Sequence, residues 1–116
     1  MKFMFIGSRR YLLTVQQQIS ELGLPQVLTA PCHTVEEALE FVQRHEPDVI
    51  FLQHSLSPEG NEGLEIAAKV KHLTIYLITA TPDIMDKYKA HGIKHVKYVL
   101  STDMEGIASV LKGESK

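Results

Sequence analysis

Short apolar segments alternate along this chain with longer segments whose apolar residues recur at helical spacing. The apolar segments are typical of strands that are buried on both faces of a sheet, and they lie at 3–6, 26–30, 49–52, 74–78 and 96–100. About five such strands, each followed by a helix, predict a doubly wound α/β fold. Right-handed crossovers then place helices on both faces of a parallel sheet.

Helix-capping and helix-breaking residues predict where the helices begin and end. Ser8 can cap the first helix, which Gly23 ends. Thr34 and Glu37 have the spacing of a capping box, and Pro47 stops the helix that they begin. The later helices are predicted at 64–71, 81–91 and 102–111.

Length and composition predict a single domain. The chain has 116 residues, of which 44% are hydrophobic and 22% are charged. This is enough to bury one hydrophobic core but not two. We therefore expect one domain over residues 1–112 and a polar tail over 113–116.

Charge, cysteine content and the first residues narrow the class of protein. The net charge of -2 and the dispersed basic residues predict no direct nucleic-acid binding, which needs clustered Lys and Arg. The single cysteine, Cys32, cannot form an internal disulfide, and the histidines lack metal-ligand spacing with it. The apolar run after Lys2 is too short for a signal peptide or a membrane span. We expect a cytoplasmic protein with no membrane contact, no metal and no cofactor.

Small and polar residues stand where the predicted strands end. In doubly wound sheets the ligand crevice lies outside the carboxyl ends of the strands. The residues at those ends are Gly7, Ser8, Gln53, Thr79 and Ser101. We expect any site to be built from them.

The most distinctive segments are EPDVIFL at 46–52, GLE at 63–65 and LITA at 77–80. With the order of the elements, they resemble the receiver domain of bacterial response regulators of the chemotaxis type, over nearly the whole chain. Tyr98 lies in the fifth strand, where receivers often have a switching aromatic residue. The resemblance implies a flavodoxin-like three-layer sandwich with strand order 2-1-3-4-5 and a role in two-component signal transduction.

Position by position, the resemblance also implies that the phosphorylation site is degenerate. The acidic pair that helps receivers hold a divalent cation falls on Gly7 and Ser8. The phosphoacceptor aspartate falls on Gln53, and the lysine of the fifth strand on or near Ser101, so that only the hydroxyl at Thr79 matches. Magnesium usually needs one or two carboxylates, and an amide cannot form an acyl phosphate. We expect no phosphotransfer and no catalytic residue.

The first functional hypothesis is a pseudo-receiver that binds a protein without phosphorylation. It would dock a partner or a second copy, as a possible homodimer, through the fourth helix, fifth strand and fifth helix. Tyr88, Tyr98 and Met104 are the residues proposed for this face. Core burial is the alternative for the apolar ones. The two tyrosines are expected to be partly exposed, because their hydroxyls need water or a partner.

The second hypothesis is a metal-independent sensor of a small anion. Ser8 opens the first helix and is followed by Arg9 and Arg10, so a helix N-terminus and two guanidinium groups meet there. Thr79 and Thr81 add hydroxyls from the end of the fourth strand. The alternative is that both arginines are ordinary solvated surface charges.

The third hypothesis, an enzyme, has the least support from the sequence. His54 stands beside Ser55 and near Ser57, but sequence neighbours seldom form a nucleophile and base pair, and no Gly-x-Ser-x-Gly elbow is present. We expect His54 to be a solvated loop histidine. It could still make the crevice sensitive to pH, because imidazole titrates near neutrality.

Overall fold

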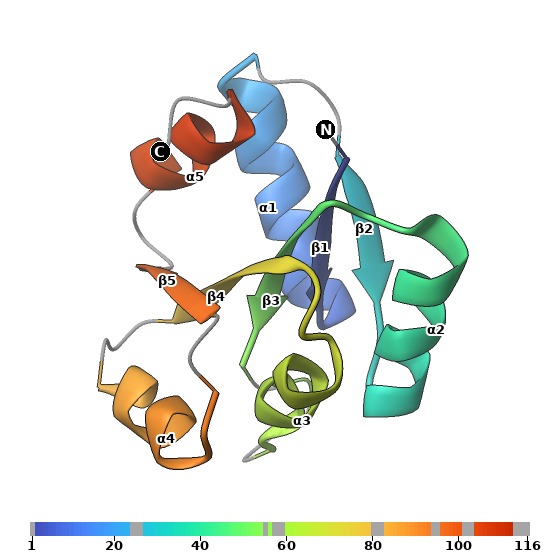
Figure 1. Cartoon of the computed structure of the whole chain (residues 1–116). Helices are drawn as coiled ribbons and strands as arrows, with labels where there is room; N and C mark the ends of the chain where they lie inside the picture. The colour runs from blue at the N-terminus through green and yellow to red at the C-terminus, as the bar shows by residue number, and fades with distance from the viewer. Residues whose placement is uncertain are drawn as a thin grey trace.

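Five parallel strands form one sheet in the order β2-β1-β3-β4-β5 (Figure 1). The strands are β1 (Phe3–Gly7), β2 (Leu28–Pro31), β3 (Val49–Gln53), β4 (Thr74–Thr79) and β5 (Val96–Leu100). The structure is a computed structural model and describes residues 2–23, 27–54, 56, 60–79, 83–93, 96–100 and 104–112. The predicted parallel sheet and its strand order are confirmed.

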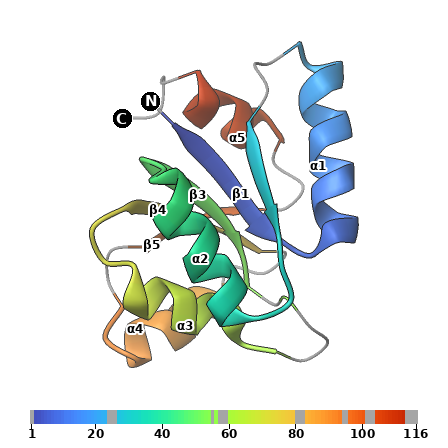
Figure 2. The same ribbon diagram turned by 90° about the vertical axis from the view of Figure 1, so that its right-hand side faces the viewer.

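Helices cover both faces of this sheet (Figure 2). They are α1 (Arg9–Glu21), α2 (Val35–His45), α3 (Glu62–Lys69), α4 (Ile84–Ala90) and α5 (Met104–Leu111). Buried residues of α1 and α5 belong to one hydrophobic cluster, and those of α2, α3 and α4 belong to another. The three-layer, flavodoxin-like arrangement is therefore confirmed.

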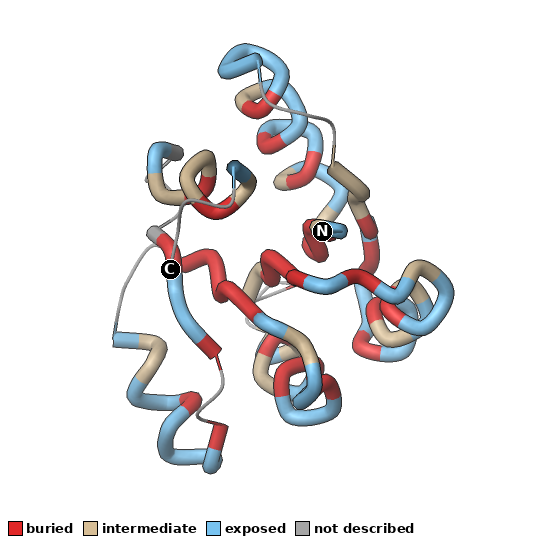
Figure 3. Tube along the Cα trace, turned by 45° about the horizontal axis from the view of Figure 1, so that its top comes forward, coloured by how far each residue is buried: buried red, intermediate tan, exposed pale blue. Residues whose placement is uncertain are grey.

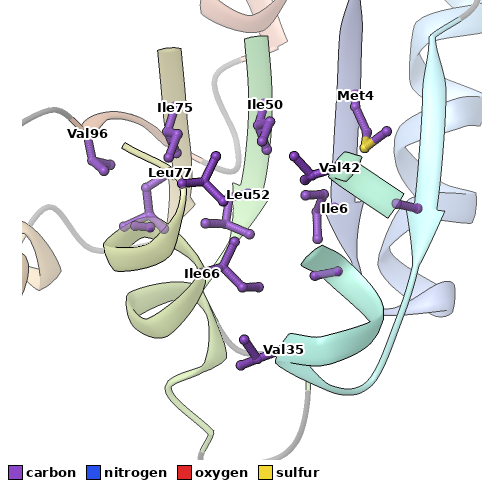
Figure 4. Close-up of a cluster of buried hydrophobic side chains, with 14 of the residues drawn as sticks. Met4, Ile6, Val35, Val42, Ile50, Leu52, Ile66, Ile75, Leu77 and Val96 are labelled. Carbon is purple, nitrogen blue, oxygen red and sulfur yellow. The ribbon is translucent and has the colours of Figure 1, made fainter. Parts of the chain in front are cut away.

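Side chains along each central strand alternate between the two clusters. Ile50 and Leu52 of β3 lie in the cluster under α2, α3 and α4 (Figure 4). Phe51 lies in the cluster under α1 and α5, where its ring stacks on Phe5 and on Tyr76 at centroid distances of 4.5 and 5.4 Å. The central strands are buried along their length, whereas the outer surfaces of the helices are exposed (Figure 3). Burial on both faces explains why these strands read as continuous apolar runs.

The predicted helix caps of α1 and α2 are confirmed. The Ser8 hydroxyl accepts from the backbone N–H of Tyr11 at 3.4 Å, and the Thr34 hydroxyl accepts from that of Glu37 at 3.2 Å. The Glu37 carboxylate in turn accepts from the His33 N–H at 3.0 Å. This last hydrogen bond is the main reason that the pKa of the Glu37 carboxyl lies below its usual value.

The start of α3 differs from the prediction. The helix spans Glu62–Lys69 instead of the predicted 64–71, so Gly63 lies inside its first turn. The Gly63 N–H donates to the carbonyl oxygen of His54 at 2.8 Å, and a Cβ on Gly63 would lie 2.8 Å from the His54 Cα. The absence of a side chain therefore lets α3 approach the end of β3. The predicted start of the fourth helix, at Thr81 and Pro82, lies outside the described residues.

Glu46 ends α2 in a left-handed conformation, with φ of 47°. A residue with a Cβ is strained there, whereas glycine is not. Glu46→Gly should therefore raise the free energy of unfolding by about 0.5–1 kcal/mol, measured by urea denaturation. Gly23, with φ of 69° and open space around it, is the matched control, and Gly23→Ala should lower stability by a similar amount. A destabilised Glu46→Gly variant would contradict this account of the helix end.

Candidate functional site

The carboxyl ends of β1, β3 and β4 meet at one edge of the sheet. Ile6 pairs with Leu52, so Gly7 lies level with Gln53, and Gln53 in turn pairs with Ile78, the neighbour of Thr79. The structure thus brings together four of the five residues predicted from strand ends: Gly7, Ser8, Gln53 and Thr79. Ser101 lies outside the described residues.

The Gln53 amide joins the end of β3 to the start of α1. Its Oε1 atom accepts a hydrogen bond from the backbone N–H of Ser8 at 2.7 Å. A helix leaves its first N–H groups without intrahelical partners, so an acceptor at this point satisfies the helix start. Gln53 of β3 thereby provides an uncharged cap for the start of α1.

Gly7 makes room for that amide. A Cβ at position 7 would lie 2.8 Å from Gln53 Oε1 and 3.2 Å from the Tyr11 ring. Any side chain at position 7, including a carboxylate, would have to displace the Gln53 amide. The residues at positions 7 and 53 are therefore sterically coupled, which their separation in the sequence did not indicate.

The described residues of this edge do not provide a donor set that fits magnesium. Gly7 offers only backbone, Ser8 and Thr79 offer neutral hydroxyls, and Gln53 offers an amide oxygen that Ser8 already engages. Mg²⁺ in proteins is usually held by at least one or two carboxylates. Asp48, the nearest acid along β3, lies at the other end of that strand, where its carboxylate accepts from the Lys2 N–H at 2.7 Å. Among the described residues, no group of three His, Cys, Asp or Glu side chains is placed to share a metal ion.

Tyr11 covers the same edge from the first turn of α1 and was missed by sequence reasoning. Its side chain is half-buried beside Gly7 and packs against the cluster under α1 and α5. Burial raises the pKa of the Tyr11 phenol well above its usual range. The phenol therefore stays neutral at physiological pH. The side chains of Tyr11 and Gln53 therefore both place uncharged groups at this edge of the sheet.

His54 is not the solvated loop residue that the sequence suggested. The ring is half-buried, with Nδ1 at 2.9 Å from the Tyr88 hydroxyl and Nε2 at 3.2 Å from Asn61 Oδ1. Lys87 Nζ donates to the same Asn61 oxygen at 2.7 Å. His54 follows Gln53 along β3, so its side chain points to the opposite face of the sheet, toward α4.

The pKa of His54 lies below that of an ordinary histidine. Burial of the imidazole is the main cause, and the positive charge of Lys87 acts in the same direction. The hydrogen bond to Asn61 and the negative charge of Glu62 oppose the shift without reversing it. His54 is therefore mostly neutral at physiological pH.

The predicted exposure of Tyr88 is wrong. Tyr88 is fully buried, and its hydroxyl finds its partner in His54 instead of in water or in another protein. Tyr98, in contrast, is 46% exposed, as predicted. Met104 begins α5, but its side chain lies outside the part of the chain that is described. Of the three residues named for a partner face, Tyr98 is the one whose exposure supports it.

The residues named for anion binding are only partly brought together. Arg9 and Arg10 are exposed on the first turn of α1, as ordinary surface charges would be. The Ser8 N–H, which an anion would need at the helix start, already donates to Gln53. Thr81 lies outside the described residues.

Lys97 does not replace the lysine that receivers have at this edge. It pairs with Tyr76 in the middle of β4, and its Nζ lies 5.8 Å from the centroid of that ring. The ammonium group of this exposed residue therefore lies over the Tyr76 ring, away from the strand ends.

The fold is similar to that of solved receiver domains. No family model matches the sequence, and no curated protein matches it either. The structure is similar to the CheY-like response regulator receiver domain from Methylobacillus flagellatus, with a TM-score of 0.69, 13% identity and 99% of each chain covered. It is also similar to the N-terminal domain of an uncharacterized protein from Wolinella succinogenes, with a TM-score of 0.71, 18% identity and coverage of 98% and 93%.

A longer protein contains the same fold as one part. The response regulator PhyR from Brucella abortus matches 97% of this chain with a TM-score of 0.67 and 17% identity, but the match spans only 46% of the PhyR chain. At these identities the likeness concerns the fold. None of the helices in the described ranges is long and apolar enough to cross a membrane.

The coupling between Gly7 and Gln53 can be measured. Gly7→Ala should push the Gln53 amide away from Ser8 and cost about 1 kcal/mol of unfolding free energy, the value of one lost hydrogen bond. In a Gln53→Ala background the same change at Gly7 should cost clearly less. A double-mutant cycle by urea denaturation gives the coupling energy, and the Ser8 amide NMR shift reports the bond directly. Strictly additive costs would show that the amide does not constrain position 7.

Proposed function

We propose that this chain is a phosphorylation-independent receiver-type module of signal transduction that acts by binding a protein. The observation that carries the proposal is the hydrogen bond from Ser8 N–H to the Gln53 amide at the position of the receiver phosphoacceptor. The receiver fold supports a signalling role, because the similar structures include response regulators. The neutral edge supports independence from phosphate.

Phosphoryl transfer depends on positioning and on positive charge that stabilises the transferring group. The described edge supplies no carboxylate nucleophile and no pair of acids for a metal ion. The Gln53 oxygen that stands at the acceptor position is a neutral amide and already accepts from Ser8. A module built in this way transmits information through binding equilibria instead of through covalent modification.

The proposed docking face consists of α4, β5 and α5. β5 is one of the two outer strands of the sheet, so among the described residues one of its edges has no neighbouring strand. Tyr98 lies on this strand beside Leu77 and is 46% exposed. Exposed tyrosines are frequent anchors of protein interfaces, because a rigid ring buries a large area and its hydroxyl still forms a hydrogen bond. The partner is a protein or a second copy of the chain.

The anion sensor is the less supported alternative. It would use Arg9 and Arg10, both exposed, at the start of α1. An anion at the helix start would have to compete with Gln53 for the Ser8 N–H. We therefore treat anion binding as an outcome to be tested beside phosphorylation.

Loss of phosphorylation is tested by backbone-amide NMR with magnesium and beryllofluoride. We expect no saturable shifts at Gly7, Ser8, Gln53 and Thr79. The single variant Gln53→Asp should also show no saturable amide shifts, because positions 7 and 8 still lack carboxylates. Saturable shifts of these amides in the parent chain would contradict the proposal. Shifts with inorganic phosphate, lost in Arg9→Ala, would favour the anion sensor.

Docking is tested through Tyr98. Tyr98→Ala should weaken association about tenfold or more, because truncating a hot-spot residue of an interface costs about 2 kcal/mol or more and about 1.4 kcal/mol is a factor of ten. Self-association is measured by sedimentation, and binding of a captured partner by titration calorimetry. Leu13→Ala is the matched control, since Leu13 is 60% exposed but lies on α1, outside the proposed face. Equal binding by parent and Tyr98→Ala, with the fold intact by NMR, would place the interface elsewhere.

A further inference from the structure

A chain of hydrogen bonds links the end of β3 to helix α4. His54 Nδ1 lies 2.9 Å from the Tyr88 hydroxyl, and His54 Nε2 lies 3.2 Å from Asn61 Oδ1. Lys87, one residue before Tyr88 on α4, donates to the same Asn61 oxygen at 2.7 Å. The imidazole therefore contacts α4 directly through Tyr88 and indirectly through Asn61.

The identity of these groups fixes which atom donates. A lysine ammonium can only donate, so the Asn61 atom that it faces is an acceptor. His54 Nε2 then carries the proton that points to Asn61. A neutral imidazole has one donor and one acceptor, so Nδ1 is the acceptor and the Tyr88 hydroxyl donates to it.

Protonation of His54 conflicts with this arrangement. Nδ1 would gain a proton and would itself have to donate to the Tyr88 oxygen, so the hydroxyl proton of Tyr88 would need a new acceptor. Tyr88 is fully buried, and Gly63 packs so closely that a Cβ there would lie 2.8 Å from the hydroxyl oxygen. A buried hydroxyl that loses its acceptor costs about 1–3 kcal/mol.

The charges that face His54 do not cancel this conflict. Lys87 on α4 opposes a second positive charge, whereas Glu62 at the start of α3 favours one. Asn61 accepts from the imidazole in either protonation state, and the phenol of Tyr88 stays neutral because burial raises its pKa above its usual range. Burial and Lys87 outweigh the other effects, so the pKa of His54 is lowered.

Helix α4 depends strongly on Tyr88 for its place in the fold. The helix has 7 residues, and Tyr88 is its buried residue. Ile84 and Met85 also pack against the cluster under α2, α3 and α4, but they are only partly buried. Helices this short are unstable alone in water and rely on tertiary packing. Weakening the contact at Tyr88 should therefore loosen the whole helix.

We propose that His54 and Tyr88 form a pH-sensitive latch, in which neutral His54 holds α4 against the end of β3 and protonation of His54 loosens α4. The latch is a property of the isolated chain. Its effect on signalling rests on the proposed function, because α4, like Tyr98 on β5, belongs to the proposed docking face. Acidification would then change the surface that a partner meets.

The direction of the effect follows from the lowered pKa. In the unfolded or opened state His54 has an ordinary pKa of about 6.5, whereas the latched state binds the proton less readily. The latch is therefore fully formed above about pH 6.5 and weakens as the pH falls below that value toward the lower pKa of the latched state. Each unit between the two pKa values makes opening of α4 about tenfold more frequent when His54 is protonated.

The test is hydrogen exchange of the α4 amides in the full chain between pH 7.5 and 5, corrected for the intrinsic pH dependence of exchange. The side-chain NMR titration of His54 is recorded in parallel. We expect protection of α4 to fall through the titration of His54, by about tenfold for each unit by which the pKa is lowered. Protection of α1 should change much less. Constant protection of α4 while His54 titrates would overturn the latch.

Two variants separate the latch from a general effect of acid. His54→Gln cannot titrate, and α4 protection should become independent of pH in this range. Tyr88→Phe keeps the ring but removes the hydroxyl, so the pKa of His54 should rise toward its ordinary value and the pH response should shrink. A pH response in both variants equal to that of the parent would overturn the proposal, even if one of them folds poorly.

His91 provides the matched control. It is exposed at the end of α4, and its Nδ1 lies 2.9 Å from the carbonyl oxygen of Lys87, a bond in which the ring donates in either protonation state. His91→Gln should leave the pH response of α4 unchanged. If the pH response is abolished in His91→Gln but retained in His54→Gln, the effect belongs to His91 and the latch is overturned. These exchange experiments use the chain without a partner, so a failure of the latch would leave the docking proposal untouched.

Discussion

Burial of β3 on both faces is the constraint on which the rest of this structure depends. β3 is the central strand of five, and its side chains alternate between the two hydrophobic clusters. A one-residue shift in register would exchange the faces of every side chain on the strand. The same alternation continues to the strand end, where Gln53 reaches α1 and His54 reaches α4. One strand thus positions both features that we consider functional.

The two features differ in what they can respond to. The Gln53 amide is uncharged and does not titrate in the physiological pH range, so its hydrogen bond with Ser8 does not respond to pH. His54 has a titratable ring between a buried hydroxyl and an amide that a lysine also contacts. In our proposal, the chain has no phosphate chemistry at the face of β3 that Gln53 occupies, and its responsive element is His54 on the other face. The glycines at positions 7 and 63 make both approaches possible, because a Cβ at either would collide with the side chain or backbone opposite it.

The docking face and the latch share helix α4 but rest on different observations. Tyr98 is exposed on the edge strand and can contact another protein directly. Tyr88 is buried beside His54, and in our proposal it acts by holding α4. Tyr88 therefore does not belong to the partner face that the sequence predicted, and we assign it instead to the attachment of α4. A buried tyrosine with a histidine partner satisfies its hydroxyl as well as water would, which is why a rule that expects tyrosines to be exposed was wrong here.

The sequence by itself determined the architecture and the absence of acidic side chains at positions 7, 8 and 53. Apolar runs at strand spacing, capping residues such as Ser8 and Thr34, and the uncharged residues at positions 7, 8 and 53 are all local properties of the chain. They predicted the parallel sheet, its helices and the residues that meet at its edge. Only the tertiary structure decided which side chains contact one another. The bonds from Gln53 to Ser8 and from His54 to Tyr88 join residues separated by 45 and 34 positions, and their formation depends on strand register and helix packing, which no local pattern of residues specifies.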